Sequence, residues 1–171
     1  MRRVHRLIWL VVLSVLLVTS TTPASAREEF AIWGACGVIT NENKIVRTYE
    51  GVAGIRRVYL TCGGPKYTDK PLWGYRHIQA RHQRDFEVLA VRTAQNWRDI
   101  ADVGMGGSLR DPEVRGPVID GKRCFSRKIY YYNLETGKLV STVIIKTIFR
   151  TTDNAIVTTY PSDEHCDGSR R

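Results

Sequence analysis

The sequence lacks the motifs of the common enzyme classes. Its glycine-rich stretch at 104–107 has no Lys-Ser/Thr ending, so it does not match a phosphate loop. No Ser/His/Asp or Cys/His catalytic signature is evident, and there is no internal repeat or low-complexity tract. The longest apolar run, residues 7–18, has twelve residues, whereas a membrane-spanning helix needs about 20. An active site in this chain must therefore be assembled from scattered residues.

The first 26 residues have the pattern of a secretory signal. Arginines at positions 2, 3 and 6 precede the apolar run, and Ala24-Ser25-Ala26 fits a small-residue cleavage site. We interpret residues 1–26 as a signal peptide, the alternative being an uncleaved N-terminal anchor. The interpretation predicts a secreted protein with no stable membrane insertion once the signal is cleaved.

Cleavage after Ala26 would leave 145 residues, a length that suits one domain with its own core. The three arginines of the signal would be lost, so 23 basic and 17 acidic residues would remain, for a net charge of about +6. A basic secreted domain favours an anionic partner, namely nucleic acid, anionic lipid or an acidic wall polymer. Charge alone does not choose among these, and a slightly basic solvated surface is the simpler alternative.

Four cysteines follow the signal: Cys36, Cys62, Cys124 and Cys166. An even number in a secreted chain predicts two disulfides, for which three pairings are possible. We expect the pairing of near neighbours, Cys36–Cys62 and Cys124–Cys166, which would close each half of the chain separately. The spacings of 26, 62 and 42 residues do not match a zinc-ligand pattern, so we expect neither a metal site nor a cofactor.

Helical spacing dominates the middle of the chain, after an irregular N-terminal lobe that carries an extended piece at 54–61. We predict a short helix over 75–82 and a longer one over 85–103, stopped by the glycines at 104–107. The longer helix would bury one face, which consists of Phe86, Leu89, Trp97 and Ile100. Residues 108–121 read as a loop, because they contain two prolines.

The C-terminal part is rich in β-branched and aromatic residues and predicts three strands, at 124–133, 139–151 and 155–160. Short loops join them, so the strands should form an antiparallel meander. Helices followed by such a sheet predict the α+β class. We expect a single domain, in which a disulfide-clipped lobe at 27–72 joins a helix-plus-sheet core at 73–171.

Residues 73–82 concentrate two histidines and two arginines, and the mature chain has only one other histidine, His165. His77 and Arg81 are four apart and share a helix face, so they could act as a proton acceptor beside a phosphate-gripping guanidinium. His82 lies roughly 140° around the helix from His77, so the two cannot easily ligate one metal ion. For His82, a catalytic role and a packing or capping role both remain open.

Cations recur on one face of the predicted sheet. Along 139–151, alternation places Leu139, Val143, Ile145 and Phe149 on one face, and Lys146 with Arg150 on the other. Adjacent strands contribute further polar side chains to this face. We therefore expect a cluster of polar and cationic side chains there, next to the helix that carries His77. Its members are Lys128, Lys146, Arg150, Thr158 and Tyr160. The alternative is a solvated face on which the cations only discourage aggregation.

The order of these pieces resembles the barnase–EndoU–colicin–RelE-like group of small ribonucleases, especially secreted toxin and phage-borne members. The resemblance covers about residues 73–161 and is carried by Gly74-Tyr75-Arg76-His77-Ile78, Arg81-His82 and Thr158-Thr159-Tyr160-Pro161. It implies a helical histidine, His77 or His82, as catalytic acid or base, with Arg150, Thr158 and Tyr160 at the phosphate. The chain departs from the pattern by lacking a second, strand-borne histidine and by its N-terminal disulfide lobe.

The leading hypothesis is a secreted, metal-independent RNA endonuclease in which His77 takes the proton of a 2′-hydroxyl and the oxygen attacks the adjacent phosphorus. Arg81, Lys128 and Lys146 would bind the RNA substrate. By resemblance to toxins, a protective immunity-type protein would be a second partner. The alternative is a non-catalytic secreted binding module for an anionic polymer or a protein, with Tyr130–Tyr132, Trp73 and Trp97 as flat contact surfaces, although a core position is favoured for Trp97.

Overall fold

The structure is a computed structural model that describes residues 33–37, 39–64 and 73–170, so the predicted signal at 1–26 and part of the lobe at 27–72 lie outside it. The described residues form two helices and six strands in an α+β arrangement, which confirms the predicted class. In chain order the elements are β1 (Ile45–Val52), β2 (Ile55–Thr61), α1 (Gly74–Thr93), α2 (Trp97–Arg110), β3 (Val114–Ile119), β4 (Lys122–Tyr132), β5 (Leu139–Arg150) and β6 (Ile156–Ser162).

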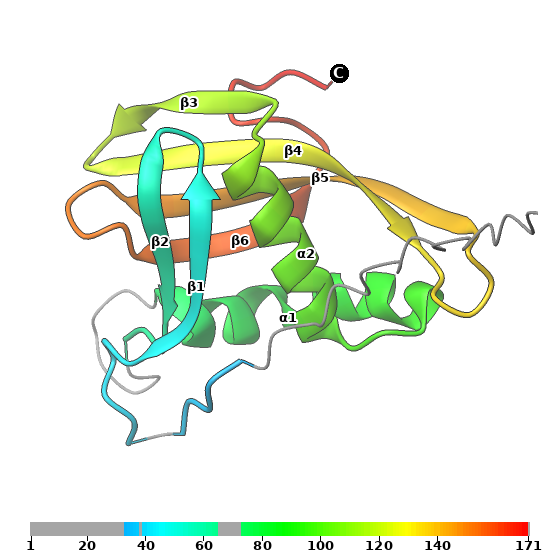
Figure 1. Cartoon of the computed structure of the whole chain (residues 1–171), viewed down its shortest axis with the longest axis horizontal. Coiled ribbons are helices and arrows are strands. Elements are labelled where there is room, and N and C mark those ends of the chain that lie inside the picture. Colours follow the sequence, from blue (N-terminus) through cyan, green and yellow to red (C-terminus); the bar gives the residue numbers. More distant parts are fainter. Residues whose placement is uncertain (1–32, 38, 65–72, 171) are drawn as a thin grey trace, which may run out of the picture.

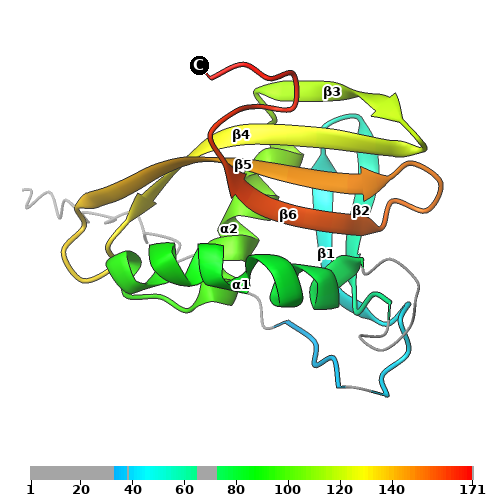
Figure 2. The ribbon, with the colours of Figure 1, turned by 180° about the vertical axis from the view of Figure 1, so that it is seen from behind.

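A four-stranded antiparallel sheet, in the order β3-β4-β5-β6, forms the centre of the molecule. The β1–β2 hairpin and α2 cover one of its faces, which we call the inner face, and α1 runs beside β6 (Figure 1). Figure 2 shows the opposite, outer face, where no helix crosses β4 and β5. Buried side chains alternate along the strands toward the inner face: Phe125, Ile129, Tyr131, Ile145 and Phe149.

Helix boundaries differ from those predicted. α1 continues without a break from Gly74 to Thr93 and ends at Ala94, which adopts a left-handed conformation with φ of 57°. Asn96 then caps α2, accepting hydrogen bonds from the Arg98 and Asp99 backbone N–H groups. The predicted helix over 85–103 therefore spans a real boundary, because capping chemistry at 96–99 outweighed the continuous apolar spacing.

The glycines at 104–107 do not stop a helix, which corrects the prediction, because α2 extends to Arg110. A Cβ atom at Gly104 would lie 3.0 Å from side-chain atoms of Ile145 and Tyr131, and one at Gly107 would lie 2.6 Å from Ile129 Cδ1. These glycines let α2 approach the sheet closely. Close packing thus compensates for their low helix propensity, which amounts to about 1 kcal/mol per glycine.

Residues 108–121 are also not the predicted loop, since they include the end of α2 and the edge strand β3. Asp120 and Gly121 both have positive φ, of 50° and 68°, and form a two-residue turn into β4. Pro117 is exposed on this edge strand, where a missing N–H is tolerated. The Asp-Gly pair was the available hairpin signal, and the prolines obscured it.

The predicted core is confirmed except at one position. Phe86, Leu89, Trp97 and Ile100 are all buried in the same cluster as Ile145 and Phe149. Leu139 is instead 50% exposed, because it lies at the far end of the β4–β5 hairpin. The hairpin turn at 134–138 is as predicted, with Gly137 at a φ of 65°.

Both expected disulfides are present. Cys36–Cys62 fastens the segment before β1 to the end of β2, and its Cα atoms are 5.5 Å apart. Cys124–Cys166 ties β4 to the tail that follows β6, with a Cα separation of 5.8 Å. Within the described ranges, no helix has the length and apolar character needed to span a membrane.

A carboxylate on α2 joins the N-terminal lobe to the core. Asp102 accepts hydrogen bonds from Arg47 at 3.0 and 3.2 Å, from the Tyr49 hydroxyl at 2.7 Å and from Trp33 Nε1 at 3.1 Å. Burial, followed by the charge of Asp102, raises the pKa of Tyr49 well above its usual value, so its hydroxyl remains a donor. The described part of the lobe therefore packs as part of the same unit as α2.

Candidate functional site

A group of titratable side chains lies where α1 meets the outer face of the sheet beside β6. We call this line of contact the α1–β6 seam. Strand register places Lys146 opposite Tyr160 and Ile148 opposite Thr158. These residues alternate with the inward-facing Ile145 and Phe149, so they belong to the outer face. α1 runs along β6 (Figure 2). Its side chains at positions 77 and 82 reach the same region, since the ring at 82 contacts Tyr160 and the ring at 77 lies beside it.

Two imidazoles and a phenol meet at one end of the seam, and we call His77, His82 and Tyr160 the histidine cluster. The ring of His82 stacks on that of Tyr160, with centroids 5.0 Å apart and planes inclined by 24°. The His77 ring lies 5.5 Å from the His82 ring. The angle of roughly 140° between these positions on a regular helix did not predict this proximity.

A carboxylate orients one of the two imidazoles. His82 Nδ1 lies 3.2 Å from Asp85 Oδ2, one helical turn further along α1. When Nδ1 carries the proton and donates to Asp85, Nε2 becomes the proton-accepting nitrogen. A partly buried imidazole held between a carboxylate and an aromatic ring therefore has the arrangement of an oriented general base. Across residues 33–37, 39–64 and 73–170, no set of three or more His, Cys, Asp or Glu side chains could hold a metal ion.

A lysine and a glutamate border the histidine cluster. Lys146 Nζ lies 3.5 Å from Glu164 Oε1, and the lysine side chain is only 12% exposed. Burial, followed by the negative charge of Glu164, raises the pKa of Tyr160 above its usual value. The Tyr160 hydroxyl is therefore protonated at neutral pH and can donate a hydrogen bond. The sequence analysis missed Glu164, because it lies in the irregular tail, where no periodicity shows the direction of a side chain.

Arg150 lies at the other end of the seam, where its guanidinium is occupied by an ion pair and an aromatic ring. Its guanidinium pairs with both carboxylate oxygens of Asp153, at 3.0 and 2.7 Å, and stands 4.1 Å from the centre of the Trp73 ring. The pKa of Asp153 is raised by its partial burial and lowered more by the hydrogen bonds from Arg150 and Ala155, so it lies below the usual value. This arrangement, which we call the arginine clamp, fastens the β5–β6 turn to the start of α1.

The structure therefore divides the predicted cluster. Arg150 pairs with Ala155 near the start of β6, whereas Tyr160 is five residues further on, a separation of roughly 15 Å along the strand. Thr158 lies between the two ends on the same face, is 8% exposed, and its Oγ1 has no hydrogen-bond partner within the described residues.

The two remaining predicted substrate-binding cations are peripheral. Lys128 lies opposite Ile144, which makes it a diagonal neighbour of Lys146 on the adjacent strand, and its backbone N–H donates to Glu113. Arg81 is exposed on α1 and shares the helix face of His77. Lys128 is thus next to Lys146 and Arg81 is next to His77 on the helix surface, while the partners of the arginine clamp include neither residue.

A serine, a histidine and a glutamate also come together beneath the C-terminal tail. His165 Nδ1 lies 3.0 Å from Ser126 Oγ, and its Nε2 lies 3.4 Å from Glu113 Oε2. The Ser126 hydroxyl accepts the Cys166 N–H, and Ser126 and His165 are 0% and 2% exposed. A substrate cannot reach the serine and the histidine, so this chain of contacts holds the tail against β4. Sequence inspection found no such signature, because the three residues are far apart in the chain.

The aromatic residues considered as contact surfaces divide in the same way. Trp97 and Tyr131 are buried, whereas Tyr130 and Tyr132 are 54% and 51% exposed at the far end of β4. Trp73 is half-buried under Arg150. The exposed tyrosines therefore lie away from the arginine clamp.

Comparison with known proteins relates the chain to two proteins of Mycobacterium tuberculosis, named "Uncharacterized protein MT0764" and "Uncharacterized protein Rv0739". Each is 30% identical over 143 residues, which cover 76% of this chain and 49% of the relative. The chain thus spans about half the length of the curated relatives it matches. No family model and no solved structure matches the chain.

Proposed function

We propose that this protein is a secreted ribonuclease that cleaves RNA through its 2′-hydroxyl without a metal ion. The observation that carries the proposal is the meeting of His77 and His82 with Tyr160, beside Lys146, on the outer face of the sheet. Two imidazoles can supply a proton acceptor and a proton donor at neutral pH. The resemblance of residues 73–161 to the barnase–EndoU–colicin–RelE-like group supports the same activity.

In the proposed reaction, His82 Nε2 takes the proton of a ribose 2′-hydroxyl, because Asp85 orients this ring with Nδ1 protonated. The 2′-oxygen forms a bond to the adjacent phosphorus, and the bond from phosphorus to the 5′-oxygen breaks. A protonated His77 gives its proton to the departing 5′-oxygen. The products are a 2′,3′-cyclic phosphate and a 5′-hydroxyl, and DNA is not a substrate because it lacks the attacking group.

Lys146 and Tyr160 supply charge stabilisation in this proposal. The ammonium of Lys146 is nearly buried, so its attraction to a phosphate oxygen is screened less than that of a surface lysine. The Tyr160 hydroxyl donates to a second oxygen, since its raised pKa keeps it protonated. Glu164 pairs with Lys146, so a bound phosphate must displace this carboxylate or share the Lys146 ammonium with it.

Secretion is part of the proposal. The two disulfides are compatible with an extracellular or periplasmic protein, because such bonds persist in oxidising compartments. The arginine-rich start, apolar run and small-residue site of residues 1–26 support export through a cleaved signal. As a secreted ribonuclease of toxin type, the protein would require a protective immunity-type protein in the cell that makes it.

The test uses the oxidised mature chain, residues 27–171, with a fluorescently labelled single-stranded RNA and its DNA counterpart. We expect RNA cleavage that EDTA does not inhibit, products ending in cyclic phosphate, and intact DNA. Cleavage that EDTA abolishes would contradict the metal-independent mechanism. Uncut RNA across pH 5–8, together with salt-dependent RNA binding, would replace the enzyme with the binding module.

A further inference from the structure

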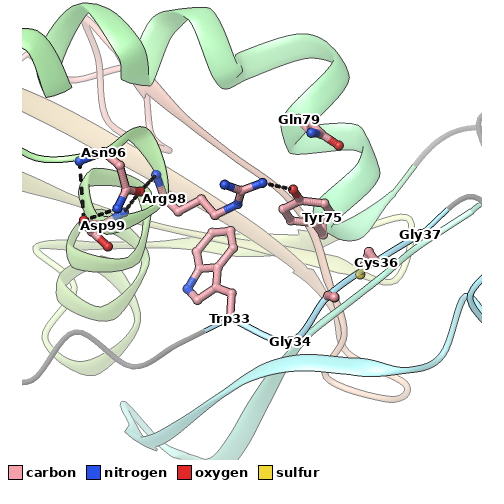
Figure 3. Close-up of a pocket in the computed structure, with 10 residues that line it drawn as sticks. Trp33, Gly34, Cys36, Gly37, Tyr75, Gln79, Asn96, Arg98 and Asp99 are labelled. Carbon is pink, nitrogen blue, oxygen red and sulfur yellow. Dashed lines mark hydrogen bonds between the residues drawn. The ribbon is translucent and has the colours of Figure 1, made fainter.

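A pocket of about 650 Å³ lies beside α1, and its lining includes none of the residues of the histidine cluster (Figure 3). Gln79 lies roughly 200° around α1 from His77 but only about 60° from His82, which is three residues further along the helix. The pocket lies between α1, the start of α2 and the segment before β1. Its lining residues are Trp33, Gly34, Ala35, Cys36, Gly37, Tyr75, Gln79, Asn96, Arg98 and Asp99.

Aromatic rings with fixed orientations form one wall. Trp33 meets Tyr75 and Trp97 edge to face, at 5.9 and 6.0 Å, and Tyr75 and Trp97 stack at 6.1 Å. Trp33 is further held by its hydrogen bond to Asp102 and remains only half-buried, whereas Tyr75 and Trp97 are buried. The wall is therefore rigid before a ligand arrives, and Trp33 is the ring that a ligand can contact.

A cation lies beside these rings. The Arg98 guanidinium stands 4.9 Å from the centre of Trp97 and 5.7 Å from that of Tyr75, and it donates to the Tyr75 hydroxyl at 2.7 Å. The Arg98 guanidinium is thus held in place, and its planar face is available for stacking with a ligand. Because this group is positively charged, the pocket disfavours a cationic ligand.

A carboxamide provides the adaptable polar contact. Asn96 and Asp99 are occupied with each other and with the start of α2 through the capping box. Gln79 is exposed on α1 and makes no hydrogen bond with the described residues, so its amide can turn toward a ligand. A carboxamide offers a donor and an acceptor side by side, which matches the edge of a nucleobase.

We propose that this pocket binds a nucleobase of single-stranded RNA, as a base-recognition site apart from the cleavage site. The inference rests on the proposed ribonuclease function and extends it. The base would contact the Trp33 ring and Arg98, and Gln79 would bond its edge. The strand would cross the exposed face of α1, a helix about 10–12 Å across, where Arg81 and Arg84 can meet its phosphates.

The test measures the binding of free nucleosides, which carry no phosphate and cannot be cleaved. Adenosine, guanosine, cytidine and uridine are titrated into mature Trp73→Phe protein, and tryptophan emission is excited at a wavelength that the nucleosides do not absorb. In this background, the remaining indoles of the mature chain are Trp33, which lines the pocket, and Trp97, which packs edge to face against Trp33. We expect saturable quenching that favours one base.

A matched pair of variants locates the binding. Gln79→Ala should raise the Kd of the preferred nucleoside roughly two- to tenfold, the loss of about one hydrogen bond. Gln83→Ala should leave the Kd unchanged, because that side chain donates to Glu87 one turn along α1 and does not line the pocket. Equal effects of the two variants, or quenching that does not saturate, would overturn the inference.

RNA cleavage measured on the same samples separates this inference from the proposed function. Cleavage without nucleoside binding would reject the base site and leave the ribonuclease intact. Nucleoside binding that depends on Gln79, without cleavage, would support the base site and reject the ribonuclease.

Discussion

The two ends of the α1–β6 seam use similar side chains in opposite ways. In the arginine clamp, Arg150 pairs with both oxygens of Asp153 and stacks on Trp73, so its charge and its plane are both occupied. At the other end, Lys146 beside the histidine cluster has a single carboxylate contact at 3.5 Å, and His82 within the cluster is hydrogen-bonded through one ring nitrogen. Charged groups whose hydrogen bonds are all made within the protein stabilise the fold. Groups with hydrogen-bonding capacity left over can exchange protons or bind a ligand. The arginine clamp is therefore suited to stabilising the fold, and the histidine cluster to the proposed chemistry.

The largest expected effect tests the chemical end. His82→Ala should lower the cleavage rate by about 10²- to 10⁴-fold, because it removes the oriented proton acceptor. Single-turnover rates on labelled RNA measure the loss, with melting temperature recorded in parallel. Gln83→Ala is the control, since this neighbour of His82 on α1 donates to Glu87 and has no part in the proposed site. A fall in melting temperature at an unchanged rate would make His82 a packing residue.

Arg150→Ala should act on stability. We expect a loss of about 1–2 kcal/mol in the free energy of unfolding, because an ion pair and a cation–π contact disappear together. Urea unfolding of the oxidised protein measures it. The rate of RNA cleavage should change by less than about threefold, which is under 1 kcal/mol. A large rate loss at unchanged stability would return Arg150 to the phosphate site that the sequence suggested.

Lys146→Ala should weaken RNA binding by roughly five- to tenfold at low salt and reduce the slope of log Kd against log salt by about one, as expected for one lost phosphate contact. Fluorescence anisotropy with a short RNA measures both quantities. Lys122→Ala, at the exposed start of β4, is the matched control. Identical slopes for the two variants would show that Lys146 does not meet phosphate.

The smallest effect concerns pH. The Asp153 pKa lies below its usual value in the folded state, so the protein binds fewer protons there than the unfolded chain does. Its contribution to stability is therefore present above the ordinary carboxyl pKa and is lost as pH falls through the folded value. Asp153→Asn should flatten the stability curve below the ordinary carboxyl pKa of about 4, measured by urea unfolding at each pH. Parallel curves for the variant and the wild type would mean that other carboxylates determine the loss of stability at low pH.

Much of the fold could be predicted because local signals were consistent. Alternation along 139–151 placed Ile145 and Phe149 in the core, and Gly137 marked the turn before it. The helix break at 94–96 was missed, since apolar spacing continues across it. The strand β3 was missed because Pro117 hid the Asp120–Gly121 turn.

The candidate site was only partly predictable. Alternation placed Lys146 and Tyr160 on one face, which the strand register bears out. The same reasoning grouped Arg150 with them, because a face pattern does not show that Asp153 and Trp73 satisfy its charge. Glu164 had no signal, since it lies in a tail whose path is held by His165 and the second disulfide.

The sequence by itself determined the class of fold and the faces of the strands, because these follow from spacing along single elements. It left three disulfide pairings open, of which the expected pairing of near neighbours is the one present. Only the tertiary structure decided which charged groups are satisfied and which are available. It brought His82 onto Tyr160, closed Asp153 on Arg150, and shaped the pocket around Trp33. Contacts between distant elements depend on how α1 and α2 dock against the sheet, and no periodicity within one element encodes that docking.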